Sequence, residues 1–296
     1  MIRPRTTVIP IAAETSRSQW ALTRRRFFRH RLAVTGLVVI ALLAVLCYGA
    51  PWIAPYSDNQ QDLLLGATGP SAEHWLGTDD LGRDFLSRLL FAGRVSLSVG
   101  LGVGVLSTLV GVVLGSLAGY LGGWADEVIM RLVDLFLIVP AIAVLALALR
   151  GLGSSPITIV FVLSALGWTV IARVARSQVL SLREKEFVDA AIVLGASTPR
   201  ILIKHMVPNL AGVIAVNVSL AVAAAIITES TLSFLGFGVQ PPESSWGNML
   251  SQASGLLGTP AMHLLIFPGV FILVTVLAVN FIGDGLRDAF DPHAKH

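Results

Sequence analysis

The polar segment 173–208 holds the residues that most suggest a specific chemical task. Two alanines, two acids and a glycine follow one another closely there: Ala190, Ala191, Glu186, Asp189 and Gly195. Alanines let another backbone come close, the acids are fixed charges beside them, and a glycine can adopt the positive φ that ends a helix. This combination favours insertion into a groove of a partner. An amphipathic helix in the lipid interface is the other interpretation that composition leaves open.

The same segment predicts a helix–turn–helix. Strong helix formers over 181–194 favour a first helix, which Gly195 ends. Ser197 and Thr198 are capping residues, and Pro199 suits the first turn of a second helix. We expect Pro208 to end that helix before the next apolar stretch.

Motifs for catalysis and cofactor binding are missing from the sequence. The patterns H-E-x-x-H, G-x-S-x-G and G-x-x-x-x-G-K-[ST] do not occur. The single cysteine, Cys47, excludes an internal disulfide, a cysteine-based zinc site and a CxxC pair. None of the histidines lies deep in an apolar stretch, which argues against a haem subunit. We therefore expect no catalytic residue, no metal site and no cofactor bound by this chain.

Composition indicates a polytopic membrane protein. Of the 296 residues, 54% are hydrophobic and only 13% are charged, whereas soluble domains carry about 25% charged residues. These values exclude a disordered chain, a nucleic-acid-binding domain and a typical soluble enzyme.

A transmembrane helix needs roughly 20 apolar residues, and six stretches of the sequence qualify as candidates. They cover residues 32–54, 95–119, 129–149 with Pro140 inside, 156–172, 209–228 and 264–283. The first is longer than the apolar part of a signal peptide and lacks an A-x-A site, so we interpret it as a retained span.

The distribution of Lys and Arg predicts the orientation. Residues 1–31 carry eight basic residues and one acid, and residues 173–208 carry six basic residues and three acids. Residues 55–93 carry two basic residues against six acids, and residues 230–264 carry no Lys or Arg. By the positive-inside rule, both termini and segment 173–208 are cytoplasmic.

We therefore divide the chain into five parts. They are a basic cytoplasmic tail (1–31), a first transmembrane helix (32–54), an outer segment (55–93), a five-helix core (94–283) that contains segment 173–208, and a cytoplasmic tail (284–296). Within the core, Arg131 and Asp134 have the spacing of a local ion pair.

Segment 173–208 resembles a family motif. The pattern Asp189-Ala190-Ala191-x3-Gly195-x12-Pro208 is similar to the EAA motif of ATP-binding-cassette importer permeases. Asp189 replaces the family's Glu, and His205 and Val207 replace its Ile and Leu. The change at His205 puts the packing of the second helix in doubt, but it does not move the glycine elbow.

Further motifs resemble the C-type subunit of dipeptide and oligopeptide permeases. These are the run from His74 to Arg88, Gly119-Tyr120-x-Gly122-Gly123 with Asp126, the run from Leu232 to Leu250, and Gly283-Asp284-Gly285-Leu286-Arg287-Asp288. These motifs follow one another in the same order as in that subunit, and together they cover most of the chain from about residue 24 onward.

The resemblance implies an all-α, six-helix type I importer fold in the bacterial inner membrane, with both termini inside and a cytoplasmic coupling helix–turn–helix. It implies a homologous second permease, two cytoplasmic subunits that bind ATP and Mg²⁺, and an extracytoplasmic solute-binding protein. The implied ATPase-docking residues are Glu186, Asp189, Ala190, Ala191, Gly195 and Pro208. Candidate contacts to the binding protein or an outer gate are Asp79, Arg83, Asp84, Gln240 and Trp246, the last also a possible interfacial anchor.

Candidate pathway residues are Asn217 and Ser219 in the fifth stretch, where helix packing is the alternative role, and Glu229 at its outer end. The cargo implied by the resemblance is a dipeptide or oligopeptide. Relatives carry nickel complexes, glutathione or other small solutes, so these stay open. A gradient-driven secondary transporter is a more remote alternative, because no acid lies clearly at mid-span.

Overall fold

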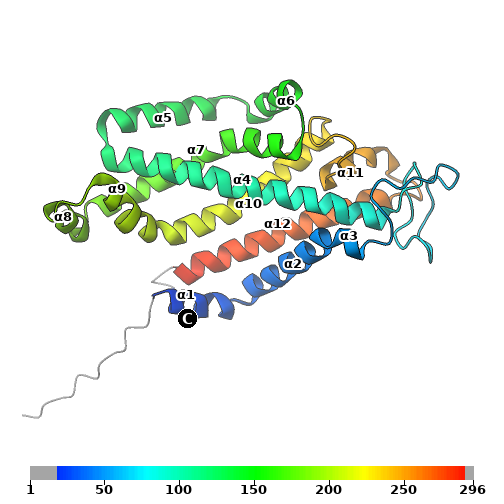
Figure 1. Cartoon of the computed structure of the whole chain (residues 1–296), viewed down its shortest axis with the longest axis horizontal. Coiled ribbons are helices and arrows are strands. Elements are labelled where there is room, and N and C mark those ends of the chain that lie inside the picture. Colours follow the sequence, from blue (N-terminus) through cyan, green and yellow to red (C-terminus); the bar gives the residue numbers. More distant parts are fainter. Residues whose placement is uncertain (1–18, 291–296) are drawn as a thin grey trace, which may run out of the picture.

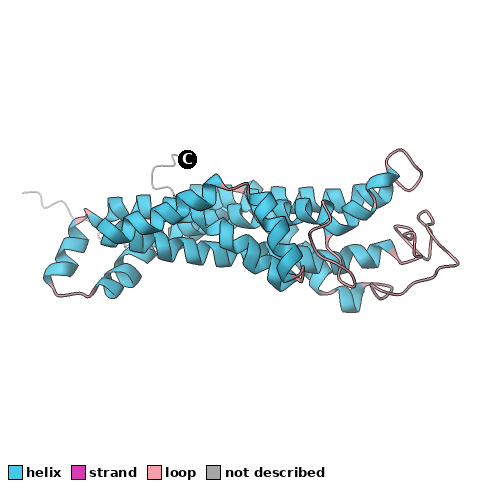
Figure 2. Cartoon of the chain, turned by 90° about the horizontal axis from the view of Figure 1, so that it is seen from above, coloured by secondary structure: helices cyan, strands magenta, loops and turns pink. Residues whose placement is uncertain are grey.

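The computed structural model describes residues 19–290, and the regular structure within that range is helical. The helices form one elongated bundle (Figures 1 and 2). The predicted tails 1–31 and 284–296 lie partly outside the described residues. The elements are α1 (Gln19–Arg29), α2 (Arg31–Tyr48), α3 (Ala50–Ile53), α4 (Phe85–Leu121), α5 (Gly123–Ile138), α6 (Ala141–Leu152), α7 (Pro156–Arg183), α8 (Glu186–Val193), α9 (Thr198–Ile201), η1 (Leu202–Met206), η2 (Val207–Leu210), α10 (Ala211–Phe234), α11 (Trp246–Gln252), η3 (Ser254–Leu256) and α12 (His263–Phe290).

Five helical stretches among the described residues are long and apolar enough to cross a membrane. The third predicted span is broken instead: α5 and α6 meet at 90°, and the total reaches six if this bent pair counts as one span. The break lies at Val139 and Pro140, both with extended backbone. Proline donates no backbone hydrogen bond and disfavours a helical residue before it, so the helix stops there.

Residues 85–93 of the predicted outer segment are helical. Helix α4 begins at Phe85, and these residues form its first turns. Asp84 caps this helix by accepting a hydrogen bond from the backbone nitrogen of Ser87 at 2.8 Å. The first predicted span, 32–54, is divided between α2, which ends at Tyr48, and the short α3, which ends at Ile53.

Helix α4 lies at the centre of the bundle, packed along α7 and α10. A row of glycines lets these helices approach closely. A Cβ atom on Gly115 would lie 2.9 Å from Cα of Ala172, and one on Gly111 would lie 2.8 Å from the carbonyl oxygen of Trp168, both on α7. On the α10 side, a Cβ on Gly100 would lie 2.6 Å from Ile226. Small residues that permit close backbone approach are typical of helix packing in membranes.

Segment 173–208 differs from the predicted helix–turn–helix in two places. The expected helix over 181–194 is divided, because α7 ends at Arg183 and α8 starts at Glu186. The second helix does not stop at Pro208. Successive α, π and 3₁₀ turns run from Thr198 into α10, which gives one helical stretch from Thr198 to Phe234. Proline occupies the first turn of η2, where its missing N–H matters least.

The two ends of the bundle carry different structures. One end holds α8 and α9, and we call it the α8 end (Figure 1). The opposite end, the α11 end, holds residues 55–84 and 235–262, which are mostly loops (Figure 2).

We expect Gly115→Leu to destabilise the protein, since the added side chain would force α4 away from α7. Overpacking of this kind costs about 1–3 kcal/mol, which should lower the Tm measured in detergent by several degrees. Gly151→Leu is the matched control, because no atom lies within 4 Å of a Cβ at Gly151. Equal Tm values for the two variants would contradict this account of α4.

Candidate functional site

The elbow after α8 has a defined geometry. Gly195 adopts φ +77°, a conformation that favours glycine. Its backbone nitrogen donates to the carbonyl of Ile192 at 2.9 Å, and that of Ala196 donates to Ala191 at 3.0 Å. This bond pair is the Schellman motif, which satisfies the last carbonyls of a helix. The predicted positive φ at Gly195 is confirmed.

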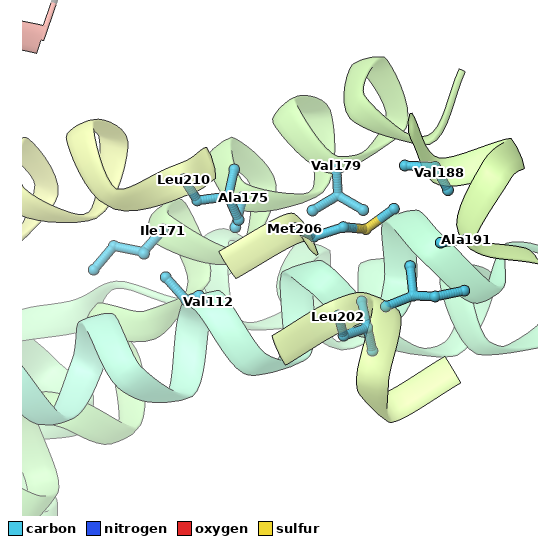
Figure 3. Close-up of a cluster of buried hydrophobic side chains, with 10 residues drawn as sticks. Val112, Ile171, Ala175, Val179, Val188, Ala191, Leu202, Met206 and Leu210 are labelled. Atoms are coloured by element: carbon cyan, nitrogen blue, oxygen red, sulfur yellow. The ribbon is translucent and has the colours of Figure 1, made fainter. Parts of the chain in front are cut away.

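One face of α8 is anchored in the bundle (Figure 3). Val188 is fully buried and Ala191 is 7% exposed, and both belong to a core cluster with Val179 of α7, Met206 of η1 and Val112 of α4. Ala191 therefore serves internal packing, and a partner cannot reach it without displacing α8. We call this cluster the α8 anchor.

The opposite face of α8 is open. Glu186, Asp189 and Ala190 are exposed, and Val193 and Leu194 are 86% and 85% exposed. Two acids, a small residue and two apolar side chains thus share one surface beside the elbow. Pro208 lies apart from it, in η2. Fixed charge with exposed apolar area is typical of a protein interaction surface.

Two ion pairs tie α5 to α7. Arg176 donates from Nε and Nη2 to the two carboxylate oxygens of Asp126, each at 2.5 Å. Asp134 pairs with Arg173. The predicted ion pair between Arg131 and Asp134 is therefore wrong, because Asp134 pairs with a cation of the facing helix. Bidentate Arg–carboxylate pairs fix geometry more tightly than single contacts.

A buried charge network organises the α11 end. The Asp79 carboxylate accepts from Arg83 Nε at 2.8 Å and from the backbone nitrogens of Leu81 and Arg83 at 2.9 and 3.1 Å. It also pairs with Arg88 of α4. Arg88 Nη2 in turn donates to Ser244 Oγ and to Gln252 Oε1 of α11, each at 3.2 Å. The network joins the first outer segment, α4 and α11.

The other outer candidates differ in accessibility. Asp84 is buried, caps α4 and pairs with His74 at 2.9 Å. Trp246 is fully buried and donates from Nε1 to the carbonyl of Leu89 at 2.9 Å. An interfacial anchor is therefore the wrong interpretation of Trp246. Gln240 is exposed and bonds only to nearby backbone oxygens. Asp79, Asp84 and Trp246 are buried within the α11 end, whereas Gln240 lies on its surface.

The three candidate pathway residues of α10 lie in different surroundings. Asn217 lines a largely apolar cavity of about 440 Å³ among α4, α5, α6, α7 and α10. Ser219 faces α12, because a Cβ on Gly283 would contact its side chain, so it packs helices together. Glu229 is 1% exposed and accepts a hydrogen bond from Ser233 Oγ at 2.7 Å. Of the three, Asn217 is the residue that lines this cavity.

Comparisons with known proteins identify the family. Residues 111–296 match the family described as binding-protein-dependent transport system inner membrane component, and residues 18–68 match the N-terminal TM domain of oligopeptide transport permease C. The chain belongs to this inner membrane transport family. It is accordingly a multi-pass permease of the bacterial inner membrane, working in a complex with other transporter subunits.

Several curated relatives are similar over nearly the whole permease. The oligopeptide transport system permease protein OppC of Bacillus subtilis is 41% identical over 96% of this chain and 92% of the relative. A putative peptide permease protein of Brucella suis is 43% identical over 93% and 91%. The OppC protein of Mycobacterium bovis is 39% identical over 94% and 96%.

Sequence reasoning missed the cations that complete the permease's ion pairs. Arg173 and Arg176 were visible only as charges near the end of an apolar stretch, and Arg88 only as the last residue of a family motif. The three-residue spacing of Arg173 and Arg176 places both on one helix face, which hints at a shared partner helix. It does not identify α5 as that helix.

We expect Arg88→Met to destabilise the α11 end of the permease, since it leaves Asp79 buried without one of its two cations. Removing one member of a buried pair costs about 3–5 kcal/mol. Thermal unfolding and limited proteolysis of residues 55–84 should detect the loss. Arg94→Met, an exposed position on the same helix, is the control. Unchanged Tm and cleavage for Arg88→Met would refute a structural role for the network.

Proposed function

We propose that this chain is one of two related permease subunits of an ATP-driven importer and forms the path for dipeptides or oligopeptides with its partner. The observation that carries the proposal is the exposed acid–alanine–glycine surface of α8, held rigidly by the α8 anchor. The names of the relatives support a peptide cargo.

The proposed energy source lies in partner chains. The sequence has no phosphate-binding G-x-x-x-x-G-K-[ST] loop, so ATP and Mg²⁺ would bind to two cytoplasmic subunits and this chain would be non-catalytic. Each ATPase subunit would receive one permease's α8 in a surface cleft, with Glu186, Asp189 and Ala190 among the contacts. Closure of the ATPase pair would then displace α8.

The structure offers a direct mechanical route from α8 into the membrane. The elbow at Gly195 leads into the helical stretch from Thr198 to Phe234, which has no loop within it. The α8 anchor joins α8 to α7 and α4 as well. A displacement of α8 would therefore tilt the helices packed against it as rigid bodies. Motion of this kind switches a transporter between two states. Nucleotide would bias those states by differential binding.

The proposed outer partner is a solute-binding protein that docks on the α11 end. Exposed groups there include Gln240, Asp80 and the apolar side chains of Leu64 and Leu257. Docked peptide would enter at the α11 end and pass toward the space lined by Asn217. Related solutes such as nickel complexes or glutathione are the alternative cargoes, and uptake assays with the co-purified binding protein would distinguish them.

We expect Ala190→Arg and Gly195→Pro to abolish peptide uptake while the permease remains in the membrane. The first adds a bulky charge to the docking surface, and the second removes the φ +77° conformation of the elbow. Ala190→Ser and Gly195→Asn are the matched controls, because serine is small and asparagine tolerates positive φ. Pull-down of a tagged chain should recover two ATP-binding subunits only with wild type and controls.

Two results would contradict the proposal. Normal uptake in both disruptive variants would exclude docking through α8. Uptake that survives ATP depletion and follows an ion gradient would favour a secondary transporter.

The proposed orientation can be tested by thiol labelling, because the only native cysteine, Cys47, is buried. Leu257→Cys at the α11 end should react with a membrane-impermeant maleimide on spheroplasts. Val193→Cys on α8 should react only after the membrane is opened. The wild-type chain is the background control. Labelling of Val193→Cys from outside would reverse the orientation.

A further inference from the structure

The basic helix α1 is a distinct element that the transport mechanism leaves without a role. Its sequence, QWALTRRRFFR, is followed by His30 and Arg31 at the start of α2. No Asp or Glu occurs in α1 or α2. Arg24, Arg25, Arg29 and Arg31 are exposed. Four exposed cations therefore gather next to the first membrane span.

Packing fixes the rotation of α1. Phe27 lies against α12, where a Cβ on Gly285 would be 3.4 Å from its ring. Phe28 stacks edge-on to Phe27 with ring centroids 5.7 Å apart, yet it is 58% exposed. At the helix end, Nδ1 of His30 accepts the backbone N–H of Ala33 at 3.1 Å and caps α2. One face of α1 is thus held by the bundle, and the opposite face points away from it.

The outward face of α1 combines an apolar side chain with cations. A shallow hollow on it is lined by Phe28, Arg24, Arg25, Leu22 and Ala21. A second hollow lies between α1 and α12 and is lined by Arg26, Arg29, His30, Arg31, Asp288 and Ala289. The one acid in this lining, Asp288, lies 3.5 Å from Nε2 of His30.

We propose that α1 is a binding site for anionic phospholipid, with Phe28 inserted at the level of the acyl chains and the phosphate held by Arg24, Arg25 and Arg29. Interfacial helices bind in this way, with aromatic and basic side chains on one surface. A juxtamembrane cluster of four or more cations is typical of attraction to anionic leaflets. An exposed phenylalanine among the arginines favours a lipid surface over a soluble polyanion, which offers no apolar phase.

The position of α1 beside α2 and α12 means that a lipid bound to α1 would affect the packing of both helices. Because Phe27 binds α1 to α12 and α1 leads directly into α2, a lipid held by α1 would brace the α2–α12 pair at the bilayer surface. This inference rests on the proposed orientation only for the choice of the inner leaflet. The binding itself needs no partner subunit.

Native mass spectrometry of the full chain in detergent, titrated with phosphatidylglycerol or phosphatidylcholine, tests the site. Wild type should bind its first phosphatidylglycerol more tightly than phosphatidylcholine. Arg24→Gln/Arg25→Gln/Arg29→Gln should weaken that first binding by roughly a hundredfold, because each cation near a lipid surface contributes about fivefold to the affinity. Phe28→Ala should weaken binding of both lipids and keep the preference for the anionic one.

The matched control removes the same charge from exposed positions elsewhere, in Arg131→Gln/Arg200→Gln/Lys204→Gln. It should bind phosphatidylglycerol as wild type does. Equal loss in both triple variants would reduce the effect to net charge and overturn the site. Displacement of the lipid by millimolar inorganic phosphate would show a free-anion site instead. Because uptake is not the readout, failure here leaves the importer proposal standing, and loss of ATPase docking leaves the lipid result unaffected.

Discussion

Close backbone contact between α4 and its neighbours is the interaction on which the rest of the structure depends. Apolar side chains gain little by leaving lipid for other apolar side chains, so helices in a membrane associate through packing and polar contacts. Glycines such as Gly100 and Gly115 remove the side chains that would keep α4 from α10 and α7. The close contact with α4 fixes the position of α7. In that position, Arg173 and Arg176 of α7 pair with the acids of α5.

The stability of α8 and the accessibility of its open face depend on this packing. An eight-residue helix is too short to be stable by itself, so the α8 anchor supplies the stability that its length cannot. The side chains of Val188 and Ala191 hold α8 against α4, α7 and η1, while Glu186, Asp189 and Ala190 stay accessible. A helix that is packed on one face and open on the other can transmit a displacement from its open face into the bundle. The unbroken stretch from Thr198 into α10 extends that rigidity across the bundle.

The α11 end is stabilised by a different kind of interaction. Loops over 55–84 and 235–262 have little regular structure to satisfy their polar groups, and a buried carboxylate partly takes that role. Asp79 accepts backbone and side-chain hydrogen bonds and pairs with Arg88, whose guanidinium reaches Ser244 and Gln252. Charged pairs in such places are costly to break once formed. The α11 end therefore behaves as one body, because its buried residues hold its exposed residues in fixed positions.

The sequence alone determined the class of protein, the approximate apolar stretches, the glycine elbow at Gly195 and the resemblance to importer permeases, because each depends on local composition or spacing. It also indicated that α8 presents acids beside Ala190. The sequence did not determine that the third stretch breaks into two helices at 90°, that helical turns continue through Pro208, or that Ala191 and Trp246 are buried. It paired Asp134 with the wrong arginine. These features depend on which helix lies opposite, and tertiary packing decides that by bringing together residues that are far apart along the chain.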